Sequence, residues 1–345
     1  MKKLLLHIGT GKTGSTTIQE AMAMLRDNGD LQGLSYPKIA NNKHHNRLCT
    51  LVMPHERIRR DIKTKYPEEN GTYKEFVERV ECLFHESAHE SDNLVLSGEF
   101  FCGYTTDEIK KFKELLIGSG FNDIKVLLYF RDPCSLYLSQ IQQRIKASSR
   151  FSNPYKYQFD YPGLYKRWRD EFDDVTVRHF DRSVLIGNDV VDDFLSVAND
   201  YFGTSLGKPA NLMPTNESLT VAGMLVQHDY RKNFYGDADN VMHSDSNRLV
   251  KQINKAEKEL DYSNKPALRP ELKRQIRANN ENGVKWVRET LGIDLGLNEK
   301  SETKSTKRFR HNLLDIIEVK DEDLRAKELI MLSIVRKLLR KRKTQ

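Results

Sequence analysis

The chain has 345 residues, of which 38% are hydrophobic and 30% charged, and its formal net charge is +7. This length and composition allow a full core, which excludes a disordered protein and favours one large α/β domain with additions or two domains. Residues 301–345 hold 13 Lys and Arg against 7 Asp and Glu, so the rest of the chain has a net charge of only +1. We therefore expect no nucleic-acid partner for the core.

The cysteines and the N-terminus indicate a cellular compartment. The cysteines lie far apart, with no Cys-x-x-Cys pair, at Cys49, Cys82, Cys102 and Cys134. This pattern predicts reduced core residues in a cytosolic protein. The apolar run near the N-terminus, 4–6, is too short for a signal peptide, and no longer run could span a bilayer. We expect a cytoplasmic protein.

A glycine-rich segment follows the first predicted strand, which covers 3–8. It comprises Gly9, Thr10, Gly11, Lys12, Thr13, Gly14, Ser15, Thr16 and Thr17. Apolar residues then recur with the spacing of an amphipathic helix, at Ile18, Ala21, Met22 and Leu25. A strand, a glycine-rich turn and a helix N-terminus direct backbone N–H groups toward an anion, and Lys12 adds a positive charge. The segment predicts a phosphate-binding loop; a tight turn with a solvated lysine is the alternative.

Part of this segment also matches the Walker A pattern of nucleoside triphosphatases, G-x-x-x-x-G-K-[ST]. Gly11, Lys12 and Thr13 correspond to its second half, whereas Leu6 holds the position of its first glycine, inside the predicted strand. The long loop that would surround a β-phosphate is therefore missing. A P-loop kinase or nucleotide hydrolase that uses ATP and magnesium stays open as the alternative function.

Further along the chain, strands and helices alternate. Apolar runs predict strands over 33–37, 93–97, 124–130 and 175–180, and helical periodicity predicts helices over 73–84, 109–116 and 190–198. This alternation predicts a mainly parallel sheet with helices on both faces. Helical patterns dominate after residue 211, at 217–235, 245–260 and 268–292. We expect a core over 1–210, a helical continuation of the same domain over 211–300, and a basic amphipathic tail over 301–345.

A second motif lies at the end of the strand over 124–130. Arg131 follows this strand, Asp132 and Pro133 are suited to an N-cap and a first helical residue, and Ser139 lies eight residues after Arg131. An arginine and a hydroxyl suit a phosphate group. The two motifs together resemble those of sulfotransferases that use 3′-phosphoadenosine 5′-phosphosulfate (PAPS): Lys12-Thr13-Gly14-Ser15-Thr16-Thr17 after a strand, then Arg131 and Ser139.

The resemblance covers about residues 3–205 and is strongest to bacterial glycan sulfotransferase-like proteins. It extends to Leu96-Ser97-Gly98-Glu99, to Phe180-Asp181-Arg182-Ser183-Val184-Leu185 and, more loosely, to Asn216-Glu217-Ser218-Leu219. The late Arg-Lys-Gly motif of mammalian cytosolic members is absent, which weakens the case for a small phenol or steroid acceptor.

The resemblance implies a P-loop-like parallel sheet with a helical C-terminal extension. It also implies transfer of a sulfuryl group from PAPS to a hydroxyl or amine, with release of PAP and no metal. On this basis Lys12 stabilises the 5′-phosphate, and Arg131 and Ser139 hold the 3′-phosphate. The phosphosulfate is held by Gly11, Thr13, Gly14, Ser15, Thr16 and Thr17.

Such a transfer requires a base that takes the proton of the acceptor. Glu99 is the first candidate because it follows an apolar strand beside the motif strand; an ion pair with Lys or Arg is its alternative. His44 and His45, in the polar segment 41–46, are the other candidates, with simple exposure as their alternative. His7 lies inside the first strand and is expected to be a packed core residue.

The acceptor is expected to be a saccharide or a lipid-linked glycan of polysaccharide biosynthesis. Residues 319–345 combine an apolar stripe with Arg and Lys, which suits a peripheral contact with the inner face of the membrane or an anionic substrate. A terminal helix packed on the domain, with a solvated basic end, is the alternative. The oligomeric state stays open.

Overall fold

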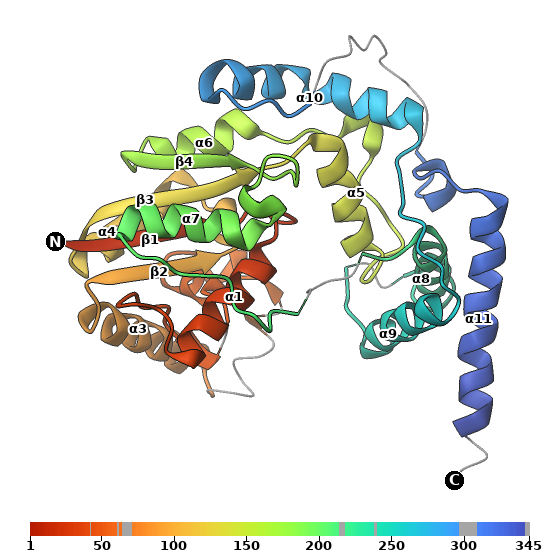
Figure 1. The fold of residues 1–345 in the computed structure, drawn as a ribbon, viewed down its shortest axis with the longest axis horizontal. Helices are drawn as coiled ribbons and strands as arrows, with labels where there is room; N and C mark the ends of the chain where they lie inside the picture. Colours follow the sequence, from red (N-terminus) through yellow and green to blue (C-terminus); the bar gives the residue numbers. More distant parts are fainter. Residues whose placement is uncertain are drawn as a thin grey trace. The chain divides into compact units, whose positions relative to one another are not determined.

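The computed structural model describes residues 1–41, 43–60, 62–63, 71–213, 218–237, 240–296 and 309–341. The chain forms two compact units. The first comprises 1–131, 160–215 and 286–295, and the second comprises 132–159, 216–285 and 296–345. Figure 1 shows the ribbon of both units.

The first unit is built on a four-stranded parallel sheet with the order β2-β1-β3-β4 (Figure 1). The strands are β1 (Lys2–Ile8), β2 (Asn93–Gly98), β3 (Phe121–Phe130) and β4 (Asp174–His179). In the register, Leu5 of β1 lies between Val95 and Lys125. The predicted fold class, a parallel sheet flanked by helices, is confirmed.

Helices cover both faces of the sheet. On one face, α1 (Ser15–Asn28) and α7 (Val190–Phe202) share a buried cluster with Leu127 and Tyr129 of β3. Successive residues of a strand point to opposite faces, so Phe130 lies on the other one. There its ring meets that of Tyr161, at the start of α6 (Tyr161–Arg169), with 5.0 Å between the ring centroids. The described part of this unit also contains α3 (Tyr73–His89) and α4 (Thr106–Gly118).

The predicted strand over 33–37 does not form. Ser35 makes a single parallel bridge with Leu94, at the edge of β2. Gly33 has a φ of 85°, which departs from extended backbone, and Pro37 has no N–H to donate to a neighbouring strand. The segment therefore touches the sheet at one position and leaves it.

The second unit is helical. It contains α5 (Pro133–Arg144), α8 (Val221–Phe234), α9 (Ser244–Glu259), α11 (Asp321–Lys341) and most of α10 (Pro270–Leu291). Asp132 caps α5 by accepting a hydrogen bond from the Ser135 N–H at 2.8 Å, as the sequence predicts. The start of the predicted helix over 217–235 and the segments 301–308 and 342–345 lie outside the described residues.

This division of the chain differs from the predicted one. Helix α5 was expected in the 1–210 core, but Tyr137 and Ile141 belong to the buried cluster of the second unit, together with Met224 and Ile276. Ile330 of α11 belongs to the same cluster, so the expected tail contributes to a core. The C-terminal helices thus form a unit with a core of its own.

The four cysteines form no disulfide, and they differ in their degree of burial. Cys49 and Cys134 are buried, whereas Cys82 is exposed on α3, so the prediction of a core residue is wrong for Cys82.

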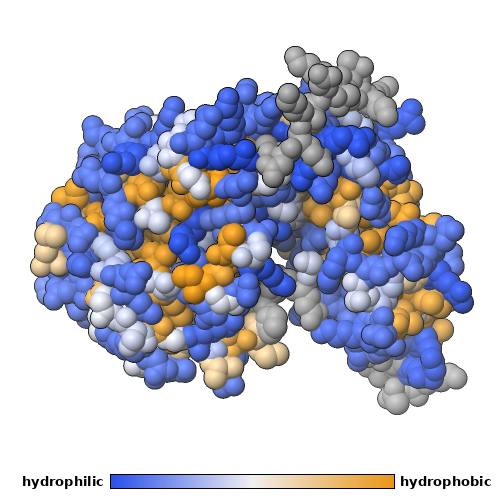
Figure 2. All heavy atoms as spheres, turned by 45° about the horizontal axis from the view of Figure 1, so that its top comes forward, coloured by the Kyte–Doolittle hydropathy of each residue, from blue (hydrophilic) through white to orange (hydrophobic). Residues whose placement is uncertain are grey.

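On the face of the molecule drawn in Figure 2, hydrophilic side chains alternate with smaller groups of apolar ones. No helix in the described parts of the chain is both long and apolar enough to cross a membrane.

Candidate active site

The carboxyl ends of the strands bring the predicted site residues of the first unit to one edge of the sheet. Strand β2 pairs on one side of β1 and β3 on the other, so the edge between β1 and β3 is a topological switch point. Open α/β sheets bind ligands at such points. Gly9 follows β1, Glu99 follows β2 and Arg131 follows β3. The parallel register of these strands therefore explains why motifs far apart in sequence meet here.

The loop between β1 and α1 has the backbone of an anion site. Gly11 and Lys12 both have a φ of 64°, and Gly14 has a φ of 78°. Turns that contain left-handed residues can direct successive N–H groups toward one side and so create anion-binding concavities. Lys12 adopts this conformation without being glycine, at a cost of about 1–2 kcal/mol. Strain of this kind concentrates at functional sites.

The N-terminus of α1 carries no side-chain cap. Its N-cap is Gly14, which has no side chain that could accept a hydrogen bond from the first N–H groups of the helix. The Gly14 carbonyl accepts from the N–H groups of Thr17 and Ile18, at 2.9 and 3.1 Å. The N–H groups at the start of a helix and the helix dipole favour a negative charge at this end. Helix α1 thus begins where the loop predicts a phosphate.

The side chains of Ser15 and Glu99 meet at Gly9. A Cβ atom added to Gly9 would lie 2.3 Å from Ser15 Oγ and 3.1 Å from Glu99 Cγ, so a side chain has no room there. Ser15 is 1% exposed, and its Oγ makes no hydrogen bond with the described residues. A buried hydroxyl without a partner costs about 1–3 kcal/mol, which a ligand that accepts its hydrogen bond would offset.

The other hydroxyls of the loop differ in what they can reach. Thr13 is buried, and its Oγ1 lies 3.3 Å from that of Thr10, which itself donates to the Tyr129 carbonyl at 2.6 Å. These bonds fasten the loop to β3. Thr16 is exposed and Thr17 is half-buried. Thr13 therefore supports the loop, while Ser15, Thr16 and Thr17 line the beginning of α1.

Arg131 is fixed against the loop. Its Nη1 donates to the Lys12 carbonyl at 2.7 Å, and its guanidinium carbon lies 5.3 Å from the centre of the Phe180 ring. Its own carbonyl accepts from the Tyr161 hydroxyl at 2.6 Å. The two predicted motifs of the first unit, Lys12 and Arg131, are thus in direct contact.

Ser139 lies in the second unit, half-buried in α5. Arg131 is the last residue of the first segment of the first unit. The shared role of Arg131 and Ser139 rests on their spacing in the sequence and stays a prediction.

The segment after β4 forms a wall beside the loop. A Cβ atom on Gly14 would lie 2.8 Å from Val190 Cγ1 and 3.1 Å from Phe180 Cε2. Between these two residues, Asp181 accepts from the Ser183 N–H and hydroxyl at 2.9 and 2.6 Å, and these bonds lower the pKa of Asp181. Gly14 is therefore required both by its conformation and by its neighbours.

Glu99 is held by residues of the 45–46 segment. His45 N–H donates to the Ser97 carbonyl at 2.8 Å, Ser97 N–H donates to His45 Nδ1 at 2.8 Å, and Phe100 N–H donates to Asn46 Oδ1 at 3.2 Å. These bonds lie on both sides of Glu99. Glu99 is half-buried, and no ion pair joins it to a lysine or arginine in the described part of the chain. The alternative of a paired carboxylate is therefore not observed.

His45 occupies a different position from the one expected of a base. It is 0% exposed, its Nδ1 accepts from Ser97 and its Nε2 donates to the Pro37 carbonyl at 2.9 Å. Burial lowers its pKa to about 4. With both ring nitrogens occupied by backbone groups, His45 has the geometry of a packed residue that joins two segments. This geometry corrects its assignment as a catalytic candidate. His44 is half-buried.

His7 is a packed core residue, as the sequence predicts. It is 0% exposed, its Nδ1 lies 2.8 Å from Ser97 Oγ, and burial lowers its pKa to about 3. The same Ser97 hydroxyl accepts from Gln19 Nε2 at 3.1 Å. This buried group connects β1, β2 and α1 below the loop.

Asn46 was not among the predicted site residues. Its role depends on a hydrogen bond to Phe100, 54 residues away in the chain. No local pattern signals such a contact, and only its place beside His45 in a polar segment could have drawn attention to it.

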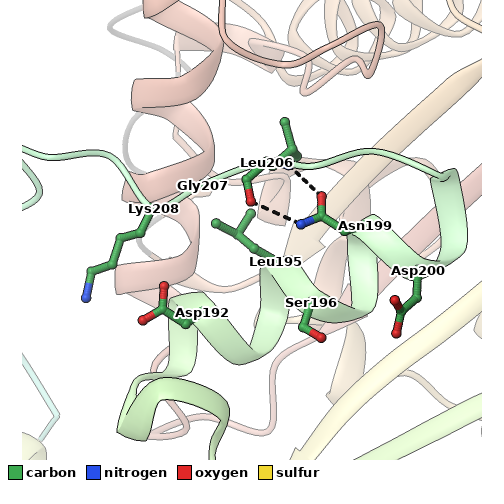
Figure 3. A pocket seen from close by; sticks show the side chains of 8 residues that line it. All are labelled: Asp192, Leu195, Ser196, Asn199, Asp200, Leu206, Gly207 and Lys208. Atoms are coloured by element: carbon green, nitrogen blue, oxygen red, sulfur yellow. Dashed lines mark hydrogen bonds between the residues drawn. The ribbon is translucent and has the colours of Figure 1, made fainter.

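A hollow lies beside α7 in the first unit (Figure 3). It has a volume of about 290 Å³ and is lined by Asp192, Leu195, Ser196, Asn199, Asp200, Leu206, Gly207 and Lys208. The Asn199 side chain exchanges two hydrogen bonds with the Leu206 backbone, at 3.0 and 2.8 Å. Its amide therefore closes the turn after α7. None of the predicted site residues lines this hollow.

Searches of protein-family models, curated proteins and solved structures find no match for this chain. Among the residues that the structure describes, no group of three or more His, Cys, Asp and Glu side chains could hold a metal ion.

Proposed function

We propose that this protein transfers a sulfuryl group from PAPS to a hydroxyl or amine of a saccharide or lipid-linked glycan and releases PAP. The observation that carries the proposal is the hydrogen bond from Arg131 Nη1 to the Lys12 carbonyl, 2.7 Å long. It joins the two motifs on which the resemblance to PAPS-dependent sulfotransferases rests. A loop that binds the 5′ end of the nucleotide would thus adjoin the arginine that we propose to bind its 3′-phosphate.

The residues of the loop suit a phosphosulfate. The loop turns through left-handed backbone at Gly11, Lys12 and Gly14 and leads into the N-terminus of α1, where N–H groups can face an anion. The Ser15 Oγ, which has no hydrogen-bond partner among the described residues, can donate to the same anion. PAPS, when bound, supplies an activated sulfuryl group and a phosphate that leaves as a stable anion. The Lys12 ammonium neutralises the charge that accumulates on this phosphate, and such electrostatic stabilisation is typically a large part of catalysis.

Glu99 is the proposed base. Its side chain lies beside Gly9, and hydrogen bonds of His45 and Asn46 fix the backbone on both sides of it. A carboxylate held in place can accept the proton of an acceptor hydroxyl as the oxygen attacks. Thr13 and His45 act through the positions they give to the loop and to the end of β2. They are positioning residues.

A neutral core with a basic C-terminal helix suits a glycan acceptor built at the cytoplasmic face of a membrane, and we propose a cytoplasmic location. The alternative function is an ATP- and magnesium-dependent kinase or nucleotide hydrolase, supported by Gly11, Lys12 and Thr13. Leu6, at the position of the first Walker glycine, lies inside β1 and is 0% exposed. This position counts against a Walker loop.

Thermal unfolding in the presence of nucleotides tests the proposal. A ligand that binds only the folded state stabilises it by about 2.7 kcal/mol at one hundred times its Kd. We expect PAP to raise the Tm by several degrees, AMP to raise it less because it lacks the 3′-phosphate, and magnesium to change neither shift. A shift with ATP and magnesium, but none with PAP, would contradict the proposal and favour the kinase.

A further inference from the structure

Helix α11 has two apolar faces, and the core of the second unit uses only one of them. Ala326 and Ile330 are buried, and Ile334 packs partly against the same cluster. Polar contacts accompany this face: Lys327 Nζ lies 2.5 Å from an Asp229 oxygen, and Lys337 Nζ lies 2.7 Å from a Glu259 oxygen. The packing of α11 against its own unit therefore does not use the other face of the helix.

The opposite face carries large apolar side chains that face solvent. They are between 48% and 64% exposed: Met331, Leu332, Val335, Leu338 and Leu339. Their spacing of three and four residues places them on one stripe of the helix. Exposed apolar residues are ordinary when scattered, but a continuous stripe of this kind marks an interaction surface. We call these five residues the outer stripe.

The charge around the outer stripe has one sign. From 329 to 341 the helix contains no Asp or Glu, and it contains Arg336, Lys337, Arg340 and Lys341. Arg336 and Arg340 are exposed. The acidic residues of α11 lie at its other end, in the first turn and at Glu328. The apolar stripe and the basic charge therefore coincide on the last three turns.

We propose that the last three turns of α11 bind the surface of an anionic membrane, with the outer stripe inserted at the level of the acyl chains. Interfacial helices combine an apolar face with Lys and Arg, and each basic residue near the surface adds attraction to anionic lipids. A second copy of the chain is a poorer partner, because helices that cross at Val335 would bring their own Arg336 and Arg340 together. The inference is independent of the proposed sulfuryl transfer.

Co-sedimentation of the full chain with vesicles tests this inference. The vesicles contain phosphatidylcholine alone or phosphatidylcholine with phosphatidylglycerol. We expect sedimentation with the anionic vesicles only, and a fall of at least about tenfold in partitioning for the double variant Leu338→Gln, Leu339→Gln. The double variant Arg336→Gln, Arg340→Gln should bind the anionic vesicles more weakly than the original protein. The difference between the two should be larger at low salt, where charges are less screened. Because these side chains face solvent, the variants should unfold at the Tm of the original protein.

A matched control comes from the first unit. Ile117 of α4 is 44% exposed, and Ile117→Gln removes an exposed apolar side chain without touching α11. It should leave sedimentation unchanged. Equal sedimentation with both kinds of vesicle, or none with either, would overturn the inference. So would a dimer, seen by sedimentation velocity without lipid, that the Leu338→Gln, Leu339→Gln variant dissociates, since the stripe would then belong to a second copy.

Discussion

Arg131 donates a hydrogen bond from Nη1 to the carbonyl of Lys12, 119 residues earlier in the chain, at 2.7 Å. The Phe180 ring and the Tyr161 hydroxyl contact the same arginine. The end of β3 and the loop after β1 are therefore fixed to each other. A ligand that orders the loop should consequently also order Arg131.

Gly14 is required at its position by conformation and by space. Gly14→Ala forces a Cβ atom into the left-handed region and against Val190, and we expect a loss of about 2–4 kcal/mol of unfolding free energy. Gly29→Ala is the matched control, because Gly29 has the same φ of 78° and no atom within 4 Å of the added Cβ. Its loss should be about 1 kcal/mol. Urea denaturation measures the loss of unfolding free energy in both variants. Equal losses would show that Phe180 and Val190 do not limit the space at Gly14.

Glu99→Gln tests the base. The substitution keeps the shape of the side chain and removes its ability to accept a proton, so we expect turnover to fall by about 10²–10⁴-fold. PAP affinity should stay within about twofold, because the change adds no unpaired charge to the loop. Turnover is followed as PAP formation from PAPS with a saccharide acceptor found by screening. Near-normal turnover with unchanged PAP affinity would remove Glu99 from the role.

Asn46 should hold the segment that contains Glu99. Asn46→Ala leaves the Phe100 N–H without its acceptor, at a cost of about 1 kcal/mol. Hydrogen exchange of the amides over 97–103 should accelerate in this variant. Asn46→Asp keeps an acceptor oxygen and should restore slow exchange. Equal exchange in the alanine and aspartate variants would show that Asn46 does not hold this segment.

The buried histidines make stability depend on pH. Burial lowers the pKa of His7 to about 3 and that of His45 to about 4, from an ordinary value of 6.5. Between these values the unfolded chain binds protons that the folded chain does not. The stability that comes from keeping these two histidines neutral is therefore complete above pH 6.5. It is lost as the pH falls toward 4, the pKa of His45, and then toward 3, the pKa of His7.

Each of these histidines adds a slope of up to about 1.4 kcal/mol per pH unit in that window. The slope is measured by urea denaturation at a series of pH values. His7→Gln removes one titrating group, so its stability should fall less steeply between about pH 4 and 6. The original protein is the control, because it contains the same carboxylates as the variant and these titrate in the same pH range. An identical slope would mean that His7 is not held neutral by burial.

Local sequence patterns predicted the part of the fold that depends on neighbouring residues. The strand before Gly9, the helix after Gly14 and the capped start of α5 at Asp132 all follow from hydrophobic spacing and from the chemistry of caps. Helix α6 was missed because it begins with Tyr161, Pro162 and Gly163, residues typical of a turn. Asp160 nevertheless caps it, through the N–H of Gly163.

The remaining features depend on contacts between distant segments. His45 occurs in a polar sequence typical of an exposed loop, yet its bonds to Ser97 and Pro37 bury it completely. Helix α5 likewise belongs to the second unit because it packs against helices such as α8, which begins about 80 residues later in the chain. Its own sequence does not reveal these partners. Sequence spacing could place Lys12 and Arg131 at strand ends, but only the parallel register of β1 and β3 brings them into contact.

The most direct test is calorimetric titration of the protein with PAP and, separately, with ATP and magnesium. The titrations are repeated on Arg131→Ala and, as a control, on Arg169→Ala, which removes an exposed arginine of α6. We predict tight PAP binding that weakens by at least about tenfold in Arg131→Ala and is unchanged in Arg169→Ala. Binding of ATP with magnesium, together with indifference to PAP, would contradict the account and show that the loop serves a nucleoside triphosphate.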